Sequence, residues 1–368
     1  MNSTHVSIIC PCYNQSEFLV EAVDSVLWQD LQNWELIIIN DGSTDNTLEL
    51  ATSYALQDSR IKVINQQNHG LSVSRNAGIL ASSGAWLHFL DADDKLLDNA
   101  FSTVLTYQNQ DPKTDVIIAS YSYFKGVSFF HSHFFDENVL GLESFFNSNI
   151  APPVSFFIKK SCQEQVGLFD ESLKSCEDWD FWIRAAKAGG KFKTIPDVLV
   201  GYRYVPTSMS RNAVQMYQAL KEVSFRAVKK DQRIGSDLPL NQDYPADVEE
   251  NLKYHFLRCL GVYLMQGNVS ESINWFKGEK EKWNWKIQLK DFEGMNTYLS
   301  FRYFLEKNEI EHLLNNTLPD FEHFFMEIGF NDGDLEKAVR IVFAPQLKKR
   351  NHYRYGKWIG ALINRLTF

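Results

Sequence analysis

Short apolar runs alternate with segments of helical period over the first hundred residues, and no other feature restricts the fold as strongly. Four runs have the length and apolar content of buried strands: Val6–Cys10, Glu35–Ile39, Ile61–Ile64 and Trp86–Leu90. Between them, apolar side chains recur at helical spacing around residues 18–27, 44–54 and 72–81. This alternation predicts an α/β fold whose sheet is parallel and covered by helices on both faces. We expect Pro11 to end the first strand.

The pattern changes twice further along the chain. Residues 110–210 are mixed, with strands predicted at 116–119, 154–158 and 198–200 and a helix at 177–188. After about residue 212 helical periodicity dominates, as in 214–230 and 248–266. The sequence therefore predicts an α/β domain at 1–212, a helical region at 213–345 and a basic amphipathic tail at 346–368.

Composition excludes several classes of protein. The 368 residues carry a formal charge of −9, which argues against a nucleic-acid binder that tracks phosphates. The five cysteines show no zinc-site spacing, which suits a reducing compartment, and we interpret Cys10 and Cys12 as small buried residues. No apolar run reaches ~18 residues, and the N-terminus lacks a signal-peptide pattern. We therefore expect a cytoplasmic protein that does not span a membrane.

Polar clusters follow the predicted strands, where an open parallel sheet binds its ligands. The first cluster contains Tyr13, whose ring can stack on a base. In the second, Asp41 can accept a hydrogen bond from a base or ribose, while Gly42 permits close approach. In the third, residues 68–76, Arg75 offers a planar fork for a phosphate or carboxylate.

The fourth cluster places three carboxylates within four residues, at Asp91, Asp93 and Asp94. Such a cluster in isolation is usually a solvated turn. After a buried strand and three ligand-shaped loops, it indicates a site where Mg²⁺ or Mn²⁺ offsets the repulsion and holds a diphosphate.

Competing nucleotide-binding classes lack their motifs. The sequence contains neither a Walker-type phosphate loop nor the glycine fingerprint of nicotinamide dehydrogenases. A nucleotidyltransferase with a similar sheet would need a basic, glycine-rich loop after the first strand, and residues 11–14 do not form one.

Five ordered motifs resemble those of the family 2 glycosyltransferases of the GT-A fold, which has a Rossmann-like, mostly parallel central sheet. They are Val6–Asn14, Asn40–Asp45, Asn68–Gly78, Phe89–Asp94 and Glu177–Arg184. The resemblance covers about residues 4–210. It implies inverting transfer from a nucleotide-diphosphate sugar to an acceptor hydroxyl, by a hexosyl- or N-acetylhexosaminyl-transferase in cell-surface polysaccharide or glycolipid synthesis.

The resemblance also implies roles for particular residues. Asp178 would be the general base with Glu177 beside it, and Asp93 would bind the metal, Mn²⁺ or Mg²⁺. Tyr13 and Asp41 would hold the base of the nucleotide, expected to be uracil. The full set expected to bind the nucleotide sugar is Pro11, Tyr13, Asn14, Asp41, Gly70, Arg75, Asp91 and Ala92.

Physical chemistry gives the Glu177–Asp178 pair an independent rationale. One-step inversion needs a base opposite the leaving diphosphate. The helix dipole would stabilise an anionic Asp178, while neighbouring Glu177 would raise its affinity for a proton, so the net effect on the pKa stays open. Of the two tryptophans that follow, we expect Trp182 in the core and Trp179 exposed as a sugar-stacking face.

One motif departs from the family. In the segment 202–210, Val205 stands where a histidine that serves the diphosphate or metal is common. Arg203, Tyr204 or Ser208 can compensate; otherwise the metal requirement is looser or the enzyme is less active. His88 does not replace that histidine, because it lies inside a strand and is expected to be a packed residue.

The tail carries six basic residues and no acidic ones between 345 and 368. Its apolar residues Trp358, Ile359, Leu362, Ile363 and Leu366 fall near one helical face. It suits either an anionic membrane surface, and thus a lipid-linked acceptor, or an acidic protein surface. If the acceptor is not linked to a lipid, we expect it to be a carbohydrate.

The alternative to an active transferase is a catalytically weak nucleotide-sugar-binding partner or regulator.

Overall fold

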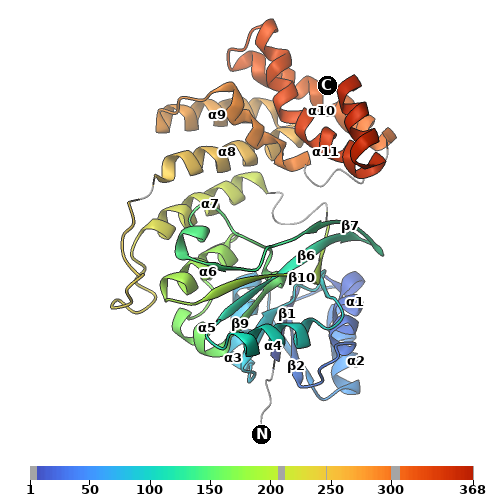
Figure 1. Cartoon of the computed structure of the whole chain (residues 1–368), viewed down its shortest axis with the longest axis vertical. Helices are drawn as coiled ribbons and strands as arrows, with labels where there is room; N and C mark the ends of the chain where they lie inside the picture. Colours follow the sequence, from blue (N-terminus) through green and yellow to red (C-terminus); the bar gives the residue numbers. More distant parts are fainter. Residues whose placement is uncertain (1–5, 206–211, 246, 300–306, 368) are drawn as a thin grey trace. The chain divides into compact units, whose positions relative to one another are not determined.

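The computed structural model describes residues 6–205, 212–245, 247–299 and 307–367 (Figure 1). Packing divides the chain into two units. Residues 1–205 with 223–246 form the first unit, and residues 206–222 with 247–368 form the second.

Within the described residues of the first unit, ten strands form one sheet. They are β1 (Val6–Cys12), β2 (Trp34–Asp41), β3 (Ile61–Gln66), β4 (Trp86–Phe89), β5 (Lys95–Leu96), β6 (Val116–Lys125), β7 (Ser128–His133), β8 (Asn138–Leu140), β9 (Phe156–Lys159) and β10 (Phe192–Arg203). The main path is β3-β2-β1-β4-β9-β6-β10-β5, with β7 paired to β6 and β8 to β10. The β3-β2-β1-β4 half is parallel, whereas β9 runs antiparallel to both of its neighbours.

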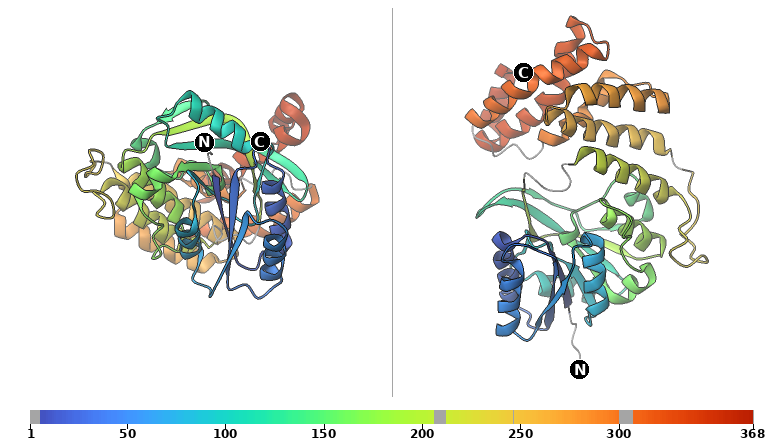
Figure 2. Two further views of the ribbon diagram at one scale, coloured as in Figure 1. Left: turned by 90° about the horizontal axis from the view of Figure 1, so that it is seen from below. Right: turned by 180° about the vertical axis from the view of Figure 1, so that it is seen from behind.

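Helices cover both faces of this sheet, as expected. They are α1 (Ser16–Leu27), α2 (Thr47–Gln57), α3 (Leu71–Ala81), α4 (Ala100–Gln110), α5 (Lys160–Val166) and α6 (Glu177–Lys187), with the short 3-10 helices η1 (Leu142–Phe145) and η2 (Pro153–Ser155). Figure 2 shows α1 and α2 in dark blue on one face and α3 in lighter blue on the other. Helix α7 (Ala213–Val228) runs from the second unit into the first.

Strand β1 continues through Pro11, so the expectation that Pro11 ends it is wrong. The carbonyl of Ile9 accepts a hydrogen bond from Leu90 on the β4 side, and Pro11, two residues on, faces the same side. Strand β4 ends at Phe89. The missing N–H of Pro11 therefore leaves no ladder bond unmade, while β1 keeps its pairing with β2 through Cys12.

Aromatic packing brings the start of α6 to the end of β4. The ring of Phe89, two residues before Asp91, lies 6.2 Å from Phe181 and 6.3 Å from Trp182 of α6. Trp182 also stacks on Phe156 of β9 at 4.0 Å and is fully buried, as expected for a core residue. These contacts fix the end of β4 and the first turn of α6 relative to each other.

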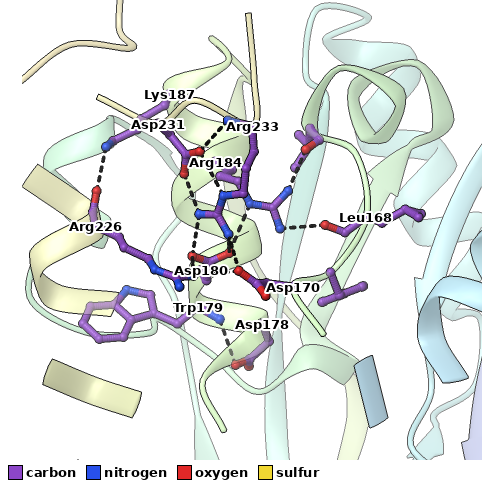
Figure 3. A network of polar contacts seen from close by, with 12 residues as sticks. Leu168, Asp170, Asp178, Trp179, Asp180, Arg184, Lys187, Arg226, Asp231 and Arg233 are labelled. Atoms are coloured by element: carbon purple, nitrogen blue, oxygen red, sulfur yellow. Dashed lines mark hydrogen bonds and ion pairs between the residues drawn. The ribbon is translucent and has the colours of Figure 1, made fainter. Parts of the chain in front are cut away.

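A buried network of charges attaches residues 223–246 to α6 (Figure 3). Asp180 is 2% exposed and pairs with Arg184 at 3.1 Å, Arg226 at 3.3 Å and Arg233 at 2.8 Å. Lys187 donates to the carbonyl of Arg226 at 2.9 Å. This segment lies beyond the boundary expected near residue 212, yet it packs with the first unit.

The described part of the second unit is helical. It contains α8 (Val248–Met265), α9 (Val269–Trp283), the 3-10 segment η4 (Leu289–Leu299), α10 (Lys307–Glu327) and α11 (Asp332–Thr367). Its core is aromatic, with Phe276 against Phe324 at 5.6 Å and Phe292 against Phe325 at 5.1 Å. In the part of the chain that the structure describes, every helix is too short or too polar to cross a membrane.

Candidate active site

A buried arginine joins the end of β4 to the start of α6. Arg75 of α3 is 1% exposed. Its Nη2 donates to Asp91 Oδ1 at 2.9 Å, and its Nη1 donates to Glu177 Oε1 at 2.6 Å. Burial lowers the pKa of Arg75, but the charges of Asp91 and Glu177 outweigh it and the net pKa is raised. The family resemblance implies that Arg75 contacts the nucleotide. In the structure, its two terminal nitrogens donate hydrogen bonds to Glu177 and Asp91.

The first turn of α6 holds Asp178 by two hydrogen bonds. The backbone N–H of Trp179 donates to Oδ1 at 2.8 Å, and Asn149 Nδ2 donates to Oδ2 at 2.6 Å. Cys176, just before α6, has a φ of 59°. A non-glycine residue in the left-handed region is uncommon, and such strain is concentrated at functional sites.

The net effect of the opposing influences is to raise the pKa of Asp178. Burial and the charge of Glu177 raise its pKa to about 7, although Arg75, the Trp179 N–H and Asn149 act in the other direction. A carboxylate with a pKa near neutrality is suited to accept a proton from an alcohol and to release it again.

Tyr202 of β10 lies within electrostatic reach of both ends of the site. Burial raises the pKa of its hydroxyl, and the charges of Asp94, Asp93, Asp91 and Asp178 raise it further. The structure thus brings the carboxylates after β4 and the carboxylate on α6 to one region, together with the Asp91–Arg75–Glu177 bridge.

Two of the three carboxylates after β4, those of Asp93 and Asp94, have few hydrogen-bond donors. Burial and the charge of Asp91 raise the pKa of Asp93 to about 6. Asp94 is 1% exposed, and burial and the charge of Asp93 raise its pKa well above the ordinary value. Asp94 Oδ1 accepts from the Arg203 N–H at 2.8 Å, while its buried Oδ2 has no partner among the described residues.

The side chain of Arg203 holds the backbone of the turn at Asp93. Its Nε donates to the carbonyl of Asp93 at 2.5 Å, its Nη2 pairs with Glu21, and its guanidinium lies 4.6 Å from the Phe18 ring and 4.3 Å from the Phe124 ring. The sequence offers Arg203 as a contact for the acceptor or diphosphate. In the structure its side chain is buried and holds the Asp93 backbone instead.

The residues present fit a divalent cation that is shared with a ligand. No group of three or more His, Cys, Asp or Glu side chains within the described ranges is arranged to hold a metal. Mg²⁺ is, however, commonly held by one or two carboxylates with substrate phosphates and water. Asp93, half-buried and short of donors, supplies the hard oxygen ligand that such a site needs.

The loops expected to hold the nucleotide are tied to one another. Tyr13 is 48% exposed, as a base-stacking ring requires. Asn14 has a φ of 53°, accepts a hydrogen bond from the Thr44 N–H at 2.8 Å and donates its own N–H to Ser43 at 3.0 Å. The loops after β1 and β2 therefore lie together at the carboxyl edge of the sheet.

Asp41 is engaged within the protein. Its carboxylate accepts from Gln66 at 2.8 Å and from the N–H groups of His69 at 2.9 Å and Gly70 at 2.8 Å. Gly42 has a φ of 73°, and a Cβ there would lie 2.7 Å from the Asn68 nitrogen, so a glycine is needed, as expected.

The remaining sequence-predicted residues lie as follows. Trp179 is 1% exposed and donates its indole N–H to the Phe145 carbonyl at 2.8 Å, so the expectation of an exposed sugar-stacking ring is wrong. Pro11, Ala92 and Tyr204 are buried, and Ser208 lies outside the described residues. His88 is buried against Phe157, as expected for a packed residue, and Cys10 and Cys12 are buried free thiols.

Sequence reasoning missed three residues of this site. Asn149, Tyr202 and Glu21 contact or influence the carboxylates or their support. Tyr202 begins the segment 202–210, which resembles a family motif, so its position was a usable signal. Asn149 lies between η1 and η2 in an irregular loop, where no periodicity marks it.

Comparison with known proteins identifies the family of the N-terminal part of the chain. The family model for glycosyl transferase family 2 matches residues 7–165. Residues 7–165 are a family 2 glycosyltransferase domain. The match spans the first four sequence motifs, and the expected family is confirmed.

Relatives and solved structures extend the match. The chain is 30% identical over 224 residues to the uncharacterized glycosyltransferase EpsJ of Bacillus subtilis, covering 56% of this chain and 62% of EpsJ. It is 38% identical over 117 residues to glycosyltransferase GlyG of Streptococcus pneumoniae, covering 32% of this chain and 38% of GlyG. The chain thus spans less than two thirds of either relative.

Structural similarity extends over nearly the whole chain. The crystal structure of S. aureus TarS 1–349 in complex with UDP aligns with a TM-score of 0.54 at 16% identity, covering 96% of this chain and 92% of that one. The complex of TarS 1–349 with UDP-GlcNAc gives 0.53 at the same identity and coverage. The expected GT-A fold with a helical C-terminal region is confirmed.

Proposed function

We propose that the protein is an inverting glycosyltransferase that moves a sugar from a UDP-sugar to an acceptor hydroxyl. The observation that carries the proposal is the continuous set of contacts from Asp91 through Arg75 to Glu177, with Asp178 adjacent. These contacts connect the candidate general base to the carboxylates after β4, where Asp93 is suited to hold a cation and, through it, a diphosphate.

In the proposed reaction Asp178 removes the proton of the acceptor hydroxyl. The hydroxyl oxygen attacks the anomeric carbon of the donor sugar, and the bond from that carbon to the diphosphate oxygen breaks. The UDP leaves with the bonding electrons, and the configuration at the anomeric carbon is inverted. The raised pKa of Asp178, about 7, makes the carboxylate a stronger base than an ordinary aspartate.

The leaving diphosphate gains negative charge in this step. A Mg²⁺ or Mn²⁺ ion held by Asp93 would stabilise that charge without transfer of a proton. Arg203 fixes the Asp93 backbone in this proposal, so it acts on the metal loop although it need not touch the ligand.

The nucleotide loops and the structural relatives favour a UDP-sugar. Tyr13 offers an exposed ring for stacking on uracil, with Asn14 and Asp41 in the adjoining loops. TarS has been crystallised with UDP and with UDP-GlcNAc. We extend that donor class to this chain, which makes a hexosyl or N-acetylhexosaminyl group the transferred unit.

The proposed acceptor is a carbohydrate or a lipid-linked glycan of cell-surface polysaccharide or glycolipid synthesis. The proposed location is the cytoplasm or the inner face of the membrane. The domain division at residues 212 and 345 remains part of this proposal, with the qualification that residues 223–246 pack with the first unit.

Asp178→Asn is the decisive test. An amide cannot take the acceptor proton, so transfer should fall about a thousandfold or more. Binding of the UDP-sugar, measured by calorimetry with Mn²⁺, should stay near the wild-type value because the donor loops are intact.

A matched variant separates charge loss from loss of a base. Asp180→Asn, two residues along α6, removes a carboxylate that pairs with three arginines away from the reacting groups. It should lower stability more than transfer. Equal transfer rates for wild type and Asp178→Asn would remove the proposed base, and no transfer by the wild type with any donor would favour the binding-protein alternative.

A further inference from the structure

The end of α11 exposes large apolar side chains. Gly356 interrupts the helix, with a φ of 76° and a ψ of 169°. Beyond it, Trp358 is 87% exposed, Ile359 59% and Leu362 57%. We call these three side chains the apolar ridge.

The ridge faces away from the contact that holds this part of the helix. A Cβ at Gly360 would lie 2.7 Å from the Asn351 carbonyl oxygen and 2.7 Å from the His352 Cα. The helix therefore packs through its Gly360 side on the preceding turns. At 3.6 residues per turn, positions 358 and 362 each lie about 160° from position 360. Trp358 and Leu362 thus stand one above the other on the opposite side.

The charge around the ridge is positive. Residues 345–368 contain no acidic residue in a chain with a net charge of −9. The six basic residues are Lys348, Lys349, Arg350, Arg354, Lys357 and Arg365. Lys357, next to Trp358, is exposed. A helix with an aromatic apolar face and basic flanks matches a surface that is anionic outside and apolar beneath.

We propose that the apolar ridge inserts into the headgroup region of an anionic lipid bilayer while the exposed Lys348, Lys349 and Lys357 contact the phosphates. The ridge belongs to one helix, whereas a stable protein interface buries about 800 Å² on each partner. Three side chains supply only a part of such an area, but an indole and a leucine suffice to anchor in a bilayer interface with the help of basic residues. The inference rests on the proposed function for its purpose, which is access to a lipid-linked acceptor.

Vesicle co-sedimentation with the full chain tests this proposal. The protein should sediment with vesicles of phosphatidylcholine and phosphatidylglycerol but not with phosphatidylcholine alone, and added salt should weaken the binding. The pair Trp358→Ser and Leu362→Ser should lower the affinity at least about tenfold, because both apolar anchors are lost.

A matched pair controls for surface hydrophobicity in general. Trp28 is 74% exposed and Leu56 is 83% exposed, both in the first unit. Trp28→Ser with Leu56→Ser should bind vesicles like the wild type. All four positions are exposed, so both pairs should keep the wild-type thermal midpoint.

Three outcomes would overturn the proposal. They are an absence of binding to anionic vesicles, an equal loss in both pairs, and a change in oligomeric state on ridge substitution with vesicle binding unchanged. The last would show that the ridge is a protein interface. The assay contains no donor sugar, so its result is independent of whether Asp178 is a catalytic base.

Discussion

The carboxylates of the nucleotide loops and those of the proposed reaction centre have opposite surroundings. Asp41 accepts three hydrogen bonds, two of them from backbone N–H groups. Desolvation disfavours the charge of Asp45, yet hydrogen bonds from Thr47 and Ser16 lower its pKa to about 2. Asp93 and Asp178, by contrast, have raised pKa values of about 6 and about 7.

The difference separates carboxylates that build the site from those that react in it. A carboxylate that is saturated with donors is a fixed anion that shapes a loop. A buried carboxylate with few donors, or with a like charge beside it as Glu177 lies beside Asp178, has a high free energy when charged, and a cation or a proton relieves that cost. The loops after β1 and β2 are thus built before ligand arrives, while the region of Asp93, Asp94 and Asp178 is completed by what it binds.

Among the variants that test this difference between the two groups of carboxylates, the largest effect should come from comparing Asp93→Asn with Asp41→Asn. Asp93→Asn removes the proposed metal ligand. Its affinity for UDP should therefore fall about a hundredfold in the presence of Mn²⁺ and change little when Mn²⁺ is absent. Asp41→Asn should weaken UDP binding equally with and without Mn²⁺, because it alters the loop that holds the base. Calorimetric titration of UDP under both conditions measures this.

The comparison fails if the two variants behave alike. A metal-independent loss in Asp93→Asn would assign that residue to the loop rather than to the cation. A metal-dependent loss confined to Asp41→Asn would reverse the two roles.

A smaller effect is expected at Asn149, which we infer to be a positioning residue for Asp178. Its amide stabilises the charged carboxylate, so Asn149→Ala should raise the pKa of Asp178 further. A base must be deprotonated to act, so the rising limb of the pH–rate profile should move to higher pH. At pH values below that limb, the loss of one hydrogen bond to a charged group should lower the transfer rate about tenfold.

The pH profile distinguishes positioning from a structural defect. Asn149→Asp adds a second carboxylate beside Asp178 and should move the limb further than Asn149→Ala. Ser148→Ala, at the exposed neighbouring position, should leave the profile unchanged. A uniform loss of rate at every pH in Asn149→Ala would assign Asn149 to the fold of its loop alone.

The smallest effect concerns stability at Asp94. Its pKa is raised in the folded protein, so the folded state holds the proton more tightly than the unfolded chain. Stability contributed by this group is therefore present at low pH and lost as pH rises above the ordinary carboxyl range. Asp94→Asn cannot ionise and should gain about 1 kcal/mol over wild type at pH 8, with less gain at pH 5.

Thermal midpoints at the two pH values measure this gain. Asp98→Asn, at an exposed position nearby, is the control for removing a carboxylate that the fold does not bury. A lower midpoint for Asp94→Asn at pH 8 would show that the charged form of Asp94 is favoured in the fold.

The sequence predicts elements well where one local period dominates. The helix expected at 177–188 is α6, Glu177–Lys187, and the four N-terminal strands lie where their apolar runs indicate. The short strands β5, β7 and β8 were not predicted. β5 has two residues and β8 three, which is too short for a period, and β7 is largely exposed, so it lacks the apolar run of a buried strand.

The sequence fails where a neighbour distant in the chain covers a face. Trp179 was expected to be exposed because the spacing of Trp182 with Phe181 and Ala185 assigned Trp182 to the core. In the structure η1 lies beside α6 and accepts the indole N–H, while Arg226 and Arg233 pair with Asp180 on the same helix. Helix α6 is consequently buried nearly all round.

The sequence by itself determined the chemistry available to this protein: the α/β order of its elements, the acidic groups after β4 and at the start of α6, and the basic apolar end of α11. Only the tertiary structure decided which of these groups meet. Arg75 and Glu177 are 102 residues apart and form an ion pair of 2.6 Å. Local backbone geometry repeats within an element and leaves a period in the sequence, whereas contacts between elements depend on packing across the whole domain and leave none.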